Sequence, residues 1–503
     1  MSKQTLFRSL AAALLMGTVA LAGCRNSTST DQPSAGVQLE NRSVNPSLVK
    51  VSMSGVETFT LISSADSIYP NPATPSKNFI FGGYADGLGF IKSQDANSAF
   101  TAVVNHEDNR CVSRITFDRN LKPLTGEYIM ASTQGRWRLC SATLAEPEVH
   151  GFGPLFLTAG ESDIAARTHR INPFAPAGTG DTVSAFGYWS AENAVPLPKT
   201  AYSGKTVIFI GDDDDSPSGG QLAMYVSNTT GDLDNGKVYV LNRNNIIEET
   251  GTNGMSKGTA YDVTFKEIAN PKTLAPQGMI DAVEALTPIK FGRVEDIDYA
   301  KDGAGRTIYF NVTGTSNGTN RSRYGRVYKL TLNSTDPAQG AKLEILMDGD
   351  VLAGPRTNTA SETSFMNPDN ICATQNYLYI QEDPNPYSEY NQGSTQHDAY
   401  IYQYNLNTGE VKLVLELDQR RNITSSTDPL AFGAGGSSSH GAWEFGALED
   451  ISEKIGVPNT FILCLQTHTW KSNNFEYPDG VINGTVSGRN EGSQLILLKG
   501  LPR

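Results

Sequence analysis

Short apolar runs bounded by turn residues recur along most of the chain. Many contain β-branched or aromatic residues and end at Gly, Asn, Asp or Pro, a pattern typical of β-strands. Long amphipathic helical patterns are nearly absent. The pattern predicts an all-β protein with strands at residues 79–81, 102–104, 205–210, 237–241, 307–312, 326–330, 377–380, 400–404, 411–417, 460–465 and 494–498.

Several neighbouring runs form hairpin patterns. Residues 400–404 lead through Asn407-Thr408-Gly409 into residues 411–417, which is the pattern of two antiparallel strands joined by a tight turn. So many strands must close on themselves or split into several sheets, and a β-propeller of large blades is the economical solution. No strict repeat is visible, so the pattern does not give the number of blades.

The first residues have the pattern of an export signal. Lys3 and Arg8 precede an apolar run, residues 10–22, that is too short for a permanent membrane helix. Leu21-Ala22-Gly23-Cys24 resembles a bacterial lipobox, in which the cysteine is lipidated; an ordinary secretory signal is the alternative. We therefore expect a signal peptide at 1–23, lipidation at Cys24, a polar tether at 24–45 and a single domain at 46–503. This organisation predicts a protein of the bacterial cell envelope, in the periplasm or at the outer membrane, attached only by its lipid.

Charge and cysteine content restrict the partners and the chemistry. The net charge of −13 argues against nucleic acid as a partner. An exported protein can form disulfides, and Cys111 with Cys140 is the expected pair by proximity, whereas Cys372 and Cys464 are expected as buried thiols. The four have no zinc-site spacing. We expect the protein to be a monomer.

Polar clusters follow or precede many of the predicted strands. In a propeller, equivalent strand ends converge on one face, so residues far apart in sequence can line one pocket. Carboxylate oxygens are the ligands that calcium prefers, and the run of four aspartates after Gly211 is the densest case. Each cluster alone is also consistent with a solvated turn. The clusters lie at residues 105–108, 159–163, 212–215, 293–298, 381–383 and 466–468.

Several of these segments together resemble the PhoX family of bacterial alkaline phosphatases. The resemblance rests on Asn105-His106-Glu107, Gly211-Asp212-Asp213, Arg293-Val294-Glu295, Pro368-Asp369-Asn370 and Leu465-Gln466-Thr467-His468, in matching order. It also includes residues 233–240 and extends from about residue 75 to the end of the chain. Gly-Asp-Asp, together with the downstream Leu-Asp-Asn-Gly-Lys-Val-Tyr, is its most specific part.

The resemblance implies a six-bladed propeller that hydrolyses phosphomonoesters outside the cytoplasm. It also implies two irons and several calcium ions at the end of the central channel. Asn105 and Arg293 would contact the phosphate of a small-molecule phosphoester substrate, and a guanidinium suits that role because its fork matches two phosphate oxygens. The implied metal ligands are Glu107, Glu161, Asp212, Asp213, Asp214, Asp234, Glu295 and Asp383.

One departure from the family concerns iron. The family's iron-bridging cysteine lies in a Thr-Cys-Glu-Glu sequence, whereas this chain reads Thr158-Ala159-Gly160-Glu161, and neither Cys111 nor Cys140 has the right context. Thiolate favours softer metals and carboxylate favours calcium. The sequence therefore supports Ca²⁺ more strongly than Fe³⁺.

Other functions are consistent with the same residues. A calcium-dependent lactonase or phosphotriesterase is a second enzyme class, although Arg293 favours a dianionic phosphate substrate. A non-catalytic lipoprotein in which calcium only stabilises the propeller is the third possibility. There is no Ser-His-Asp pattern at a strand-to-helix turn. We expect His106 to be a core or supporting residue, and the role of His468 stays open.

Overall fold

The computed structural model describes residues 36–68, 70–351, 365–384, 397–421 and 440–503. The chain divides into two compact units, 1–36 and 37–503. The predicted signal peptide, Cys24 and the first part of the predicted tether lie outside the described residues. The fold below is that of residues 37–503.

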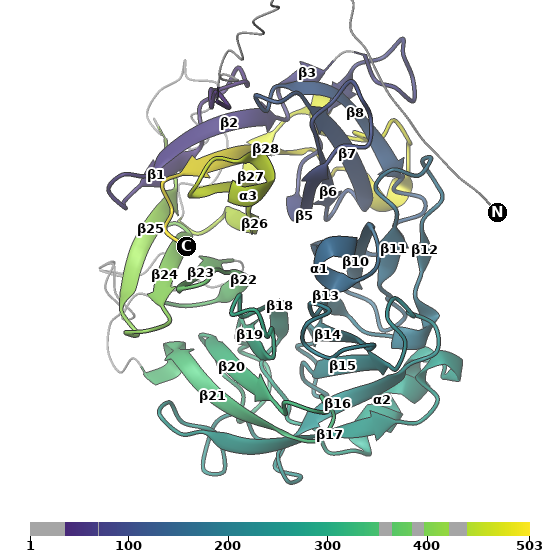
Figure 1. Ribbon diagram of the computed structural model, residues 1–503, viewed down its shortest axis with the longest axis vertical. Helices are drawn as coiled ribbons and strands as arrows, with labels where there is room; N and C mark the ends of the chain where they lie inside the picture. The colour runs from purple at the N-terminus through teal and green to yellow at the C-terminus, as the bar shows by residue number, and fades with distance from the viewer. Residues whose placement is uncertain (1–35, 69, 352–364, 385–396, 422–439) are drawn as a thin grey trace, which may run out of the picture. The chain divides into compact units, whose positions relative to one another are not determined.

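Antiparallel sheets are arranged as six blades around a central axis (Figure 1). The innermost strands contact one another in succession, from each blade to the next and from the sixth back to the first. The all-β, six-bladed propeller is therefore confirmed. From the axis outward, the blades contain β5 (Ala85–Lys92), β6 (Phe100–His106), β7 (Cys111–Phe117) and β8 (Pro123–Met130); β9 (Arg138–Ala145), β10 (Leu155–Glu161), β11 (His169–Ile171) and β12 (Asp181–Thr182); β13 (Ala191–Pro196), β14 (Thr206–Asp212), β15 (Leu222–Ser227) and β16 (Lys237–Asn242); β18 (Val294–Tyr299), β19 (Thr307–Val312), β20 (Arg326–Leu332) and β21 (Ala341–Asp348); β22 (Pro368–Ala373), β23 (Tyr377–Glu382), β24 (Tyr400–Asn405) and β25 (Val411–Leu417); β26 (Glu444–Asp450), β27 (Thr460–Lys471) and β28 (Glu491–Lys499).

Strands from the beginning of unit 37–503 close the ring. β2 (Glu57–Ser63) pairs antiparallel with β28 and so supplies the fourth strand of the sixth blade, while β1 (Val49–Val51) pairs with β25 of the fifth. This pairing satisfies backbone groups that would otherwise form exposed sheet edges. A further strand, β17 (Tyr261–Ile268), joins the third and fourth blades into one nine-stranded sheet.

Blade-to-blade packing explains the continuous apolar runs. Successive side chains of a strand point to opposite faces of its sheet. In β14, Val207 and Phe209 pack into one apolar core and Ile208 and Ile210 into another, so both faces are buried. In β27, Cys464 lies in such a core, and it is a buried free thiol as predicted; Cys372 is another.

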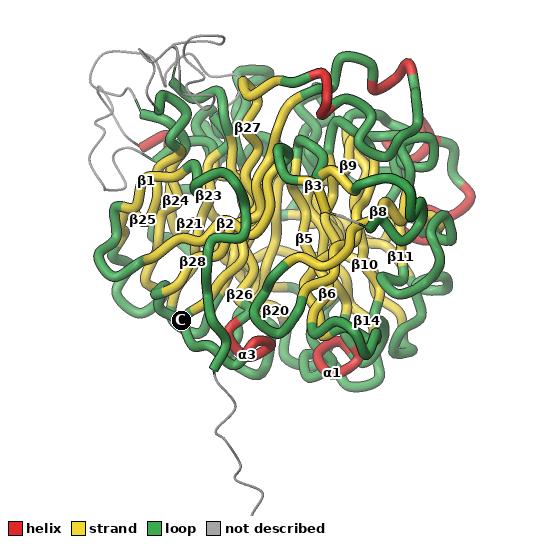
Figure 2. The backbone as a smooth tube through the Cα atoms, turned by 90° about the horizontal axis from the view of Figure 1, so that it is seen from above, coloured by secondary structure: helices red, strands yellow, loops and turns green. Residues whose placement is uncertain are grey.

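Helices are few and lie outside the sheets. α1 (Pro147–His150) and α3 (Ser452–Ile455) lie at the same end of the propeller (Figure 2). α2 (Pro276–Glu284) packs Met279 and Val283 beside the 3₁₀ turn η1 (Ser184–Phe186). Among the described residues, no helix is both long and apolar enough to cross a bilayer.

Candidate metal and active site

Each innermost strand carries an irregularity at the same position. The pairing of the first and second strands shifts between Ala85 and Leu88 in the first blade, between Val294 and Ile297 in the fourth, and equivalently in the other four. A bulge of this kind bends the strand and redirects a side chain, and bulges are frequent beside active sites. The first residues at these positions, in blade order, are Asp86, Cys140, Glu192, Glu295, Asp369 and Gly446.

A second ring of polar residues lies at the ends of the neighbouring strands. In each blade it is the residue just after the last paired residue of the second strand. Four of the six are acidic, as the strand-end clusters in the sequence indicated. In blade order they are Glu107, Glu161, Asp213, Thr313, Asp383 and Gln466.

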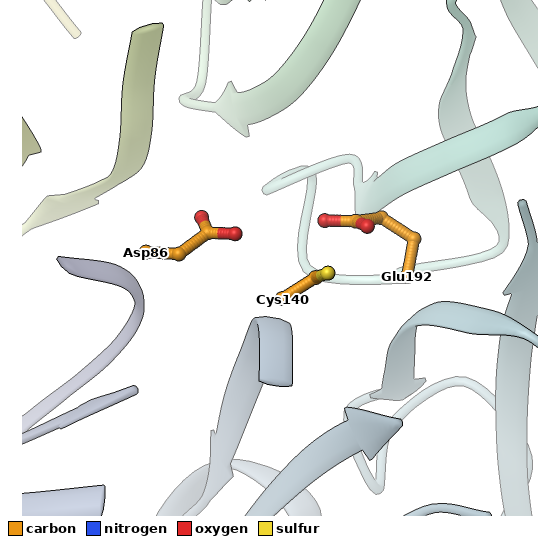
Figure 3. Close-up of side chains that lie close together, drawn as sticks. All are labelled: Asp86, Cys140 and Glu192. Atoms are coloured by element: carbon orange, nitrogen blue, oxygen red, sulfur yellow. The ribbon is translucent and has the colours of Figure 1, made fainter. Parts of the chain in front are cut away.

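The acidic members of both rings line one cavity of about 580 Å³, to which all six blades contribute. We call it the central cavity. Figure 3 shows Asp86, Cys140 and Glu192 approaching one another from three different strands. Within each of three groups, one ligand atom per residue lies within 4.8 Å of those of the others. The groups are Asp86, Cys140 and Glu192; Glu107, Cys140 and Glu161; and Glu192, Glu295 and Asp369.

The electrostatics of this cluster favour a bound cation. Burial and the neighbouring carboxylates raise the pKa of Glu192 and Glu295 well above the usual range. Burial and the charge of Asp213 raise the pKa of Glu161 to about 8. Carboxyl groups held this way are costly to ionise unless a positive charge lies among them. Hard cations take such oxygen ligands, so the donor set fits metal.

Two arginines supply the positive charge in the structure. Arg293 binds Asp213 through two nitrogens, Nε to Oδ1 at 2.5 Å and Nη2 to Oδ2 at 2.9 Å, and its Nη2 lies 3.3 Å from Glu295 Oε1. Arg138 contacts Glu107 at 3.3 Å, Asp108 at 2.9 Å and Glu161 at 3.7 Å. Both arginines stand two residues before a bulge residue, so they occupy equivalent places in the second and fourth blades.

Cys140 corrects two expectations from the sequence. Its Sγ donates to Glu161 Oε2 at 3.1 Å, so the expectation that no cysteine accompanies this glutamate is wrong. Both Cys111 and Cys140 are free thiols, so the expected disulfide is wrong as well. The cysteine reaches Glu161 from the adjacent strand β9 rather than from the segment before Glu161, which is why its sequence context gave no sign of it.

The structure brings together only part of the predicted set. Glu107, Glu161, Asp213 and Glu295 lie in the central cavity together with Arg293, and Asp383 lines it beside Glu444.

Three other predicted ligands lie elsewhere. Asp212 accepts from the backbone N of Ser190 at 3.1 Å, and Asp214 accepts from that of Ser216 at 2.8 Å, so both stabilise turns beside the cavity. Asp234 is 46% exposed and pairs with Arg170 at 3.0 Å. A strand-end aspartate is as useful for a turn as for a metal, which explains why the sequence did not separate them.

Asn105 has a different role from the one expected. Its side chain is fully buried, and its Nδ2 donates to the backbone carbonyl of Cys140 at 2.6 Å. It therefore holds the bulge that carries Cys140 and does not line the central cavity. His106 is a core residue, as predicted: its ring nitrogens lie 3.0 Å from the Gly83 carbonyl and 2.8 Å from Ser113 Oγ.

The sequence reasoning missed Asp86, Arg138, Cys140, Glu192 and Asp369 as functional candidates. All except Arg138 are bulge residues on innermost strands, and their apolar patterns are interrupted by the polar residues themselves. His468, whose role was open, lines the cavity with Nδ1 2.7 Å from Glu491 Oε2 and Nε2 3.5 Å from Glu444 Oε1.

Comparison with solved structures identifies the fold. PhoX of Pseudomonas fluorescens, solved in complex with vanadate as a transition state analogue, matches with a TM-score of 0.60 at 12% identity, covering 92% of this chain and 98% of that one. A putative 6-phosphogluconolactonase from Bacteroides uniformis matches with a TM-score of 0.30 at 15% identity, over 65% and 85% of the two chains. An alpha-L-arabinofuranosidase from Fusarium graminearum gives 0.38 at 10% identity, over 87% and 97%. No protein-family model and no curated protein matched the chain. The chain therefore has a PhoX-like fold.

Proposed function

We propose that this protein is a metal-dependent phosphomonoester hydrolase that acts outside the cytoplasm. The observation that carries the proposal is the central cavity, where carboxylates from five blades and the thiol of Cys140 surround the guanidinium of Arg293. The fold shared with PhoX, which was solved with a transition state analogue, supports the same chemistry.

The donor set supports two kinds of metal. Glu192, Glu295 and Asp369 form an all-oxygen group suited to Ca²⁺, whereas Cys140 adds a sulfur ligand to Glu107 and Glu161. A thiolate suits softer metals, so Cys140 removes the reason to set Fe³⁺ aside. We propose that the site holds Ca²⁺ together with Fe³⁺. When bound, these cations supply positive charge for the phosphoryl oxygens.

Arg293 is the residue that we assign to the substrate phosphate. Its side chain is 22% exposed, so it reaches the cavity, and Asp213 fixes its plane through two contacts. A guanidinium held in one orientation can offer paired N–H donors to a phosphate without reorganising. Asp213 and Glu295 therefore position Arg293, in addition to lining the metal cluster.

The proposed location follows from the sequence. Removal of residues 1–23 and lipidation of Cys24 would attach the propeller to the cell envelope, with the predicted tether between the lipid and the fold. We further propose that the protein acts as a monomer, because one chain closes the complete ring of blades. Radiolabelled palmitate incorporation into wild type and Cys24→Ala tests the anchor.

Hydrolysis of p-nitrophenyl phosphate tests the proposed activity. The purified protein with Ca²⁺ and Fe³⁺ should hydrolyse the ester, lose activity in chelator, and regain it when metal returns. Glu295→Gln should abolish turnover while circular dichroism and the thermal midpoint show a folded protein. Asp234→Asn is the matched control, because this exposed carboxylate lies outside the central cavity.

The alternatives have distinct outcomes in the same experiment. Turnover of a lactone or a phosphotriester without turnover of any phosphomonoester would refute the proposal in favour of the second enzyme class. Bound calcium with no turnover of any ester would indicate a non-catalytic, calcium-stabilised propeller. Elemental analysis of the purified protein identifies the metals directly.

A further inference from the structure

A second cavity of about 430 Å³ opens beside the central cavity and shares Glu161, Asp213 and Arg293 with it. We call it the side cavity. Because Arg293 borders both, a phosphate held at Arg293 would have its ester oxygen within reach of either. The rest of an ester substrate needs such an adjoining space.

One wall of the side cavity is apolar. It consists of Tyr188 and Trp189 after η1, Met279 and Ile280 from α2, and Ile164 from the loop after β10. Met279 is buried in the core, whereas Ile164 is 55% exposed, so the apolar surface continues from the core to the mouth of the cavity. The guanidinium of Arg167 lies 3.9 Å from the ring centre of Tyr188, which holds that ring in place.

The opposite wall is acidic. Asp163, Asp215 and Glu284 line the side cavity, and Arg293 is the one cation among the described residues that line it. Arg293 already neutralises Asp213 and Glu295. Lys290 lies 3.4 Å from Glu284 but directs its Nζ to the Pro217 carbonyl at 3.0 Å. A second negative charge on a ligand in this space would meet uncompensated carboxylates.

We propose that the side cavity binds the alcohol part of the substrate and that this part is an uncharged apolar or aromatic group. This inference rests on the proposed phosphomonoesterase function and specifies its substrate class. The apolar wall gains from desolvating such a group. The acidic wall rejects esters whose leaving group carries further anionic groups, such as nucleoside polyphosphates and sugar bisphosphates.

Two aryl esters of similar leaving-group chemistry test the charge selectivity. We expect the purified, metal-loaded protein to hydrolyse phenyl phosphate with a kcat/KM about fivefold higher than that for 4-carboxyphenyl phosphate at low ionic strength, a preference that salt reduces. The combined variant Asp163→Asn, Asp215→Asn, Glu284→Gln should bring the ratio close to one while activity on phenyl phosphate stays unchanged.

Apolar contact is tested separately. Ile280→Asp and Ile164→Asp should each lower kcat/KM for phenyl phosphate about tenfold, because both place a charge where the ring binds. Ile482→Asp is the matched control, since Ile482 is 85% exposed and lies outside both cavities. Using two positions guards against a folding defect in either variant.

The outcomes separate this inference from the proposed function. Equal kcat/KM for the two aryl esters in the wild-type protein, or full activity in both isoleucine variants, would overturn the assignment of the side cavity and leave the phosphatase intact. Absence of turnover with both esters in a protein that holds metal would overturn the proposed function and this inference together.

Discussion

The acidic lining of the central cavity makes the stability of the metal-free protein depend strongly on pH. Glu161 carries the sharpest prediction, because burial and the charge of Asp213 raise its pKa from 4.5 to about 8. A carboxyl group with a higher pKa in the folded state holds its proton longer there than in the unfolded chain. The folded state is therefore favoured at low pH, and this stabilisation is lost as pH rises from about 4.5 to 8.

The shift from 4.5 to about 8 sets the size of the effect. One pKa unit corresponds to about 1.4 kcal/mol, so the free energy of unfolding of the metal-free protein should fall by about 3 to 4 kcal/mol between pH 5 and pH 8 from this residue. For a domain of this length, the entropy of unfolding near 60 °C converts that into a decrease of about 3 to 4 °C in Tm. The other raised carboxyls of the cluster act in the same direction.

Thermal unfolding of chelator-treated protein at pH 5, 6.5 and 8 measures the effect. Glu161→Gln should remove part of the decrease, because glutamine has no proton to lose at the same position. Saturating Ca²⁺ should abolish or reverse the slope in the wild-type protein, since a cation stabilises the ionised carboxylates and binds only the folded cluster. A metal-free Tm that is constant or rises between pH 5 and 8 would refute the view that Glu161 is held protonated by its surroundings.

Three further predictions concern single residues. Arg293→Lys should lower kcat/KM for p-nitrophenyl phosphate about 100-fold, because a lysine cannot reproduce the two-nitrogen contact with its carboxylate partner; near-normal kinetics would contradict the role given to the guanidinium. Cys140→Ala should reduce the bound metal measured by elemental analysis, whereas Cys464→Ala, which removes a thiol from a core between blades, should leave it unchanged. Asp234→Asn should change the free energy of unfolding by about 0.5 kcal/mol or less and leave metal content intact, because its pair with Arg170 is partly exposed.

The sequence predicted the middle strands of the blades and missed the innermost ones. β14 and β27 are buried on both faces, so they read as continuous apolar runs with clear ends. The innermost strands carry polar bulge residues in their interiors, as at Glu295 in β18, and the bulge disrupts the alternation by which a strand is recognised. None of the six innermost strands was among the predicted elements.

The same cause limited the prediction of the site. The carboxylates at the ends of second strands, such as Glu107 and Glu161, follow apolar runs and could be found. Asp86, Cys140 and Glu192 could not, because their convergence depends on where five separate bulges fall around the axis. Cys140 shows this most directly: 21 positions separate it from Glu161, and only the antiparallel pairing of β9 with β10 brings them together.

The six blades are not equivalent at the axis, and the differences divide the labour between folding and chemistry. At Gly446, the bulge of the sixth blade, an added Cβ would lie 2.7 Å from the Ala85 carbonyl oxygen, so a glycine is needed where the last blade meets the first. The remaining bulge positions carry potential ligands, whose mutual repulsion would drive neighbouring blades apart.

Arg138 and Arg293 stand where they oppose that repulsion. Arg138 contacts Glu107 of the first blade and Glu161 of the second, and Arg293 joins Asp213 of the third blade to Glu295 of the fourth. Each arginine therefore holds a junction between consecutive blades while it places a guanidinium at the cavity. Because a buried charge left without its partner is strongly destabilising, the residues that shape the site also help to hold the ring of blades together.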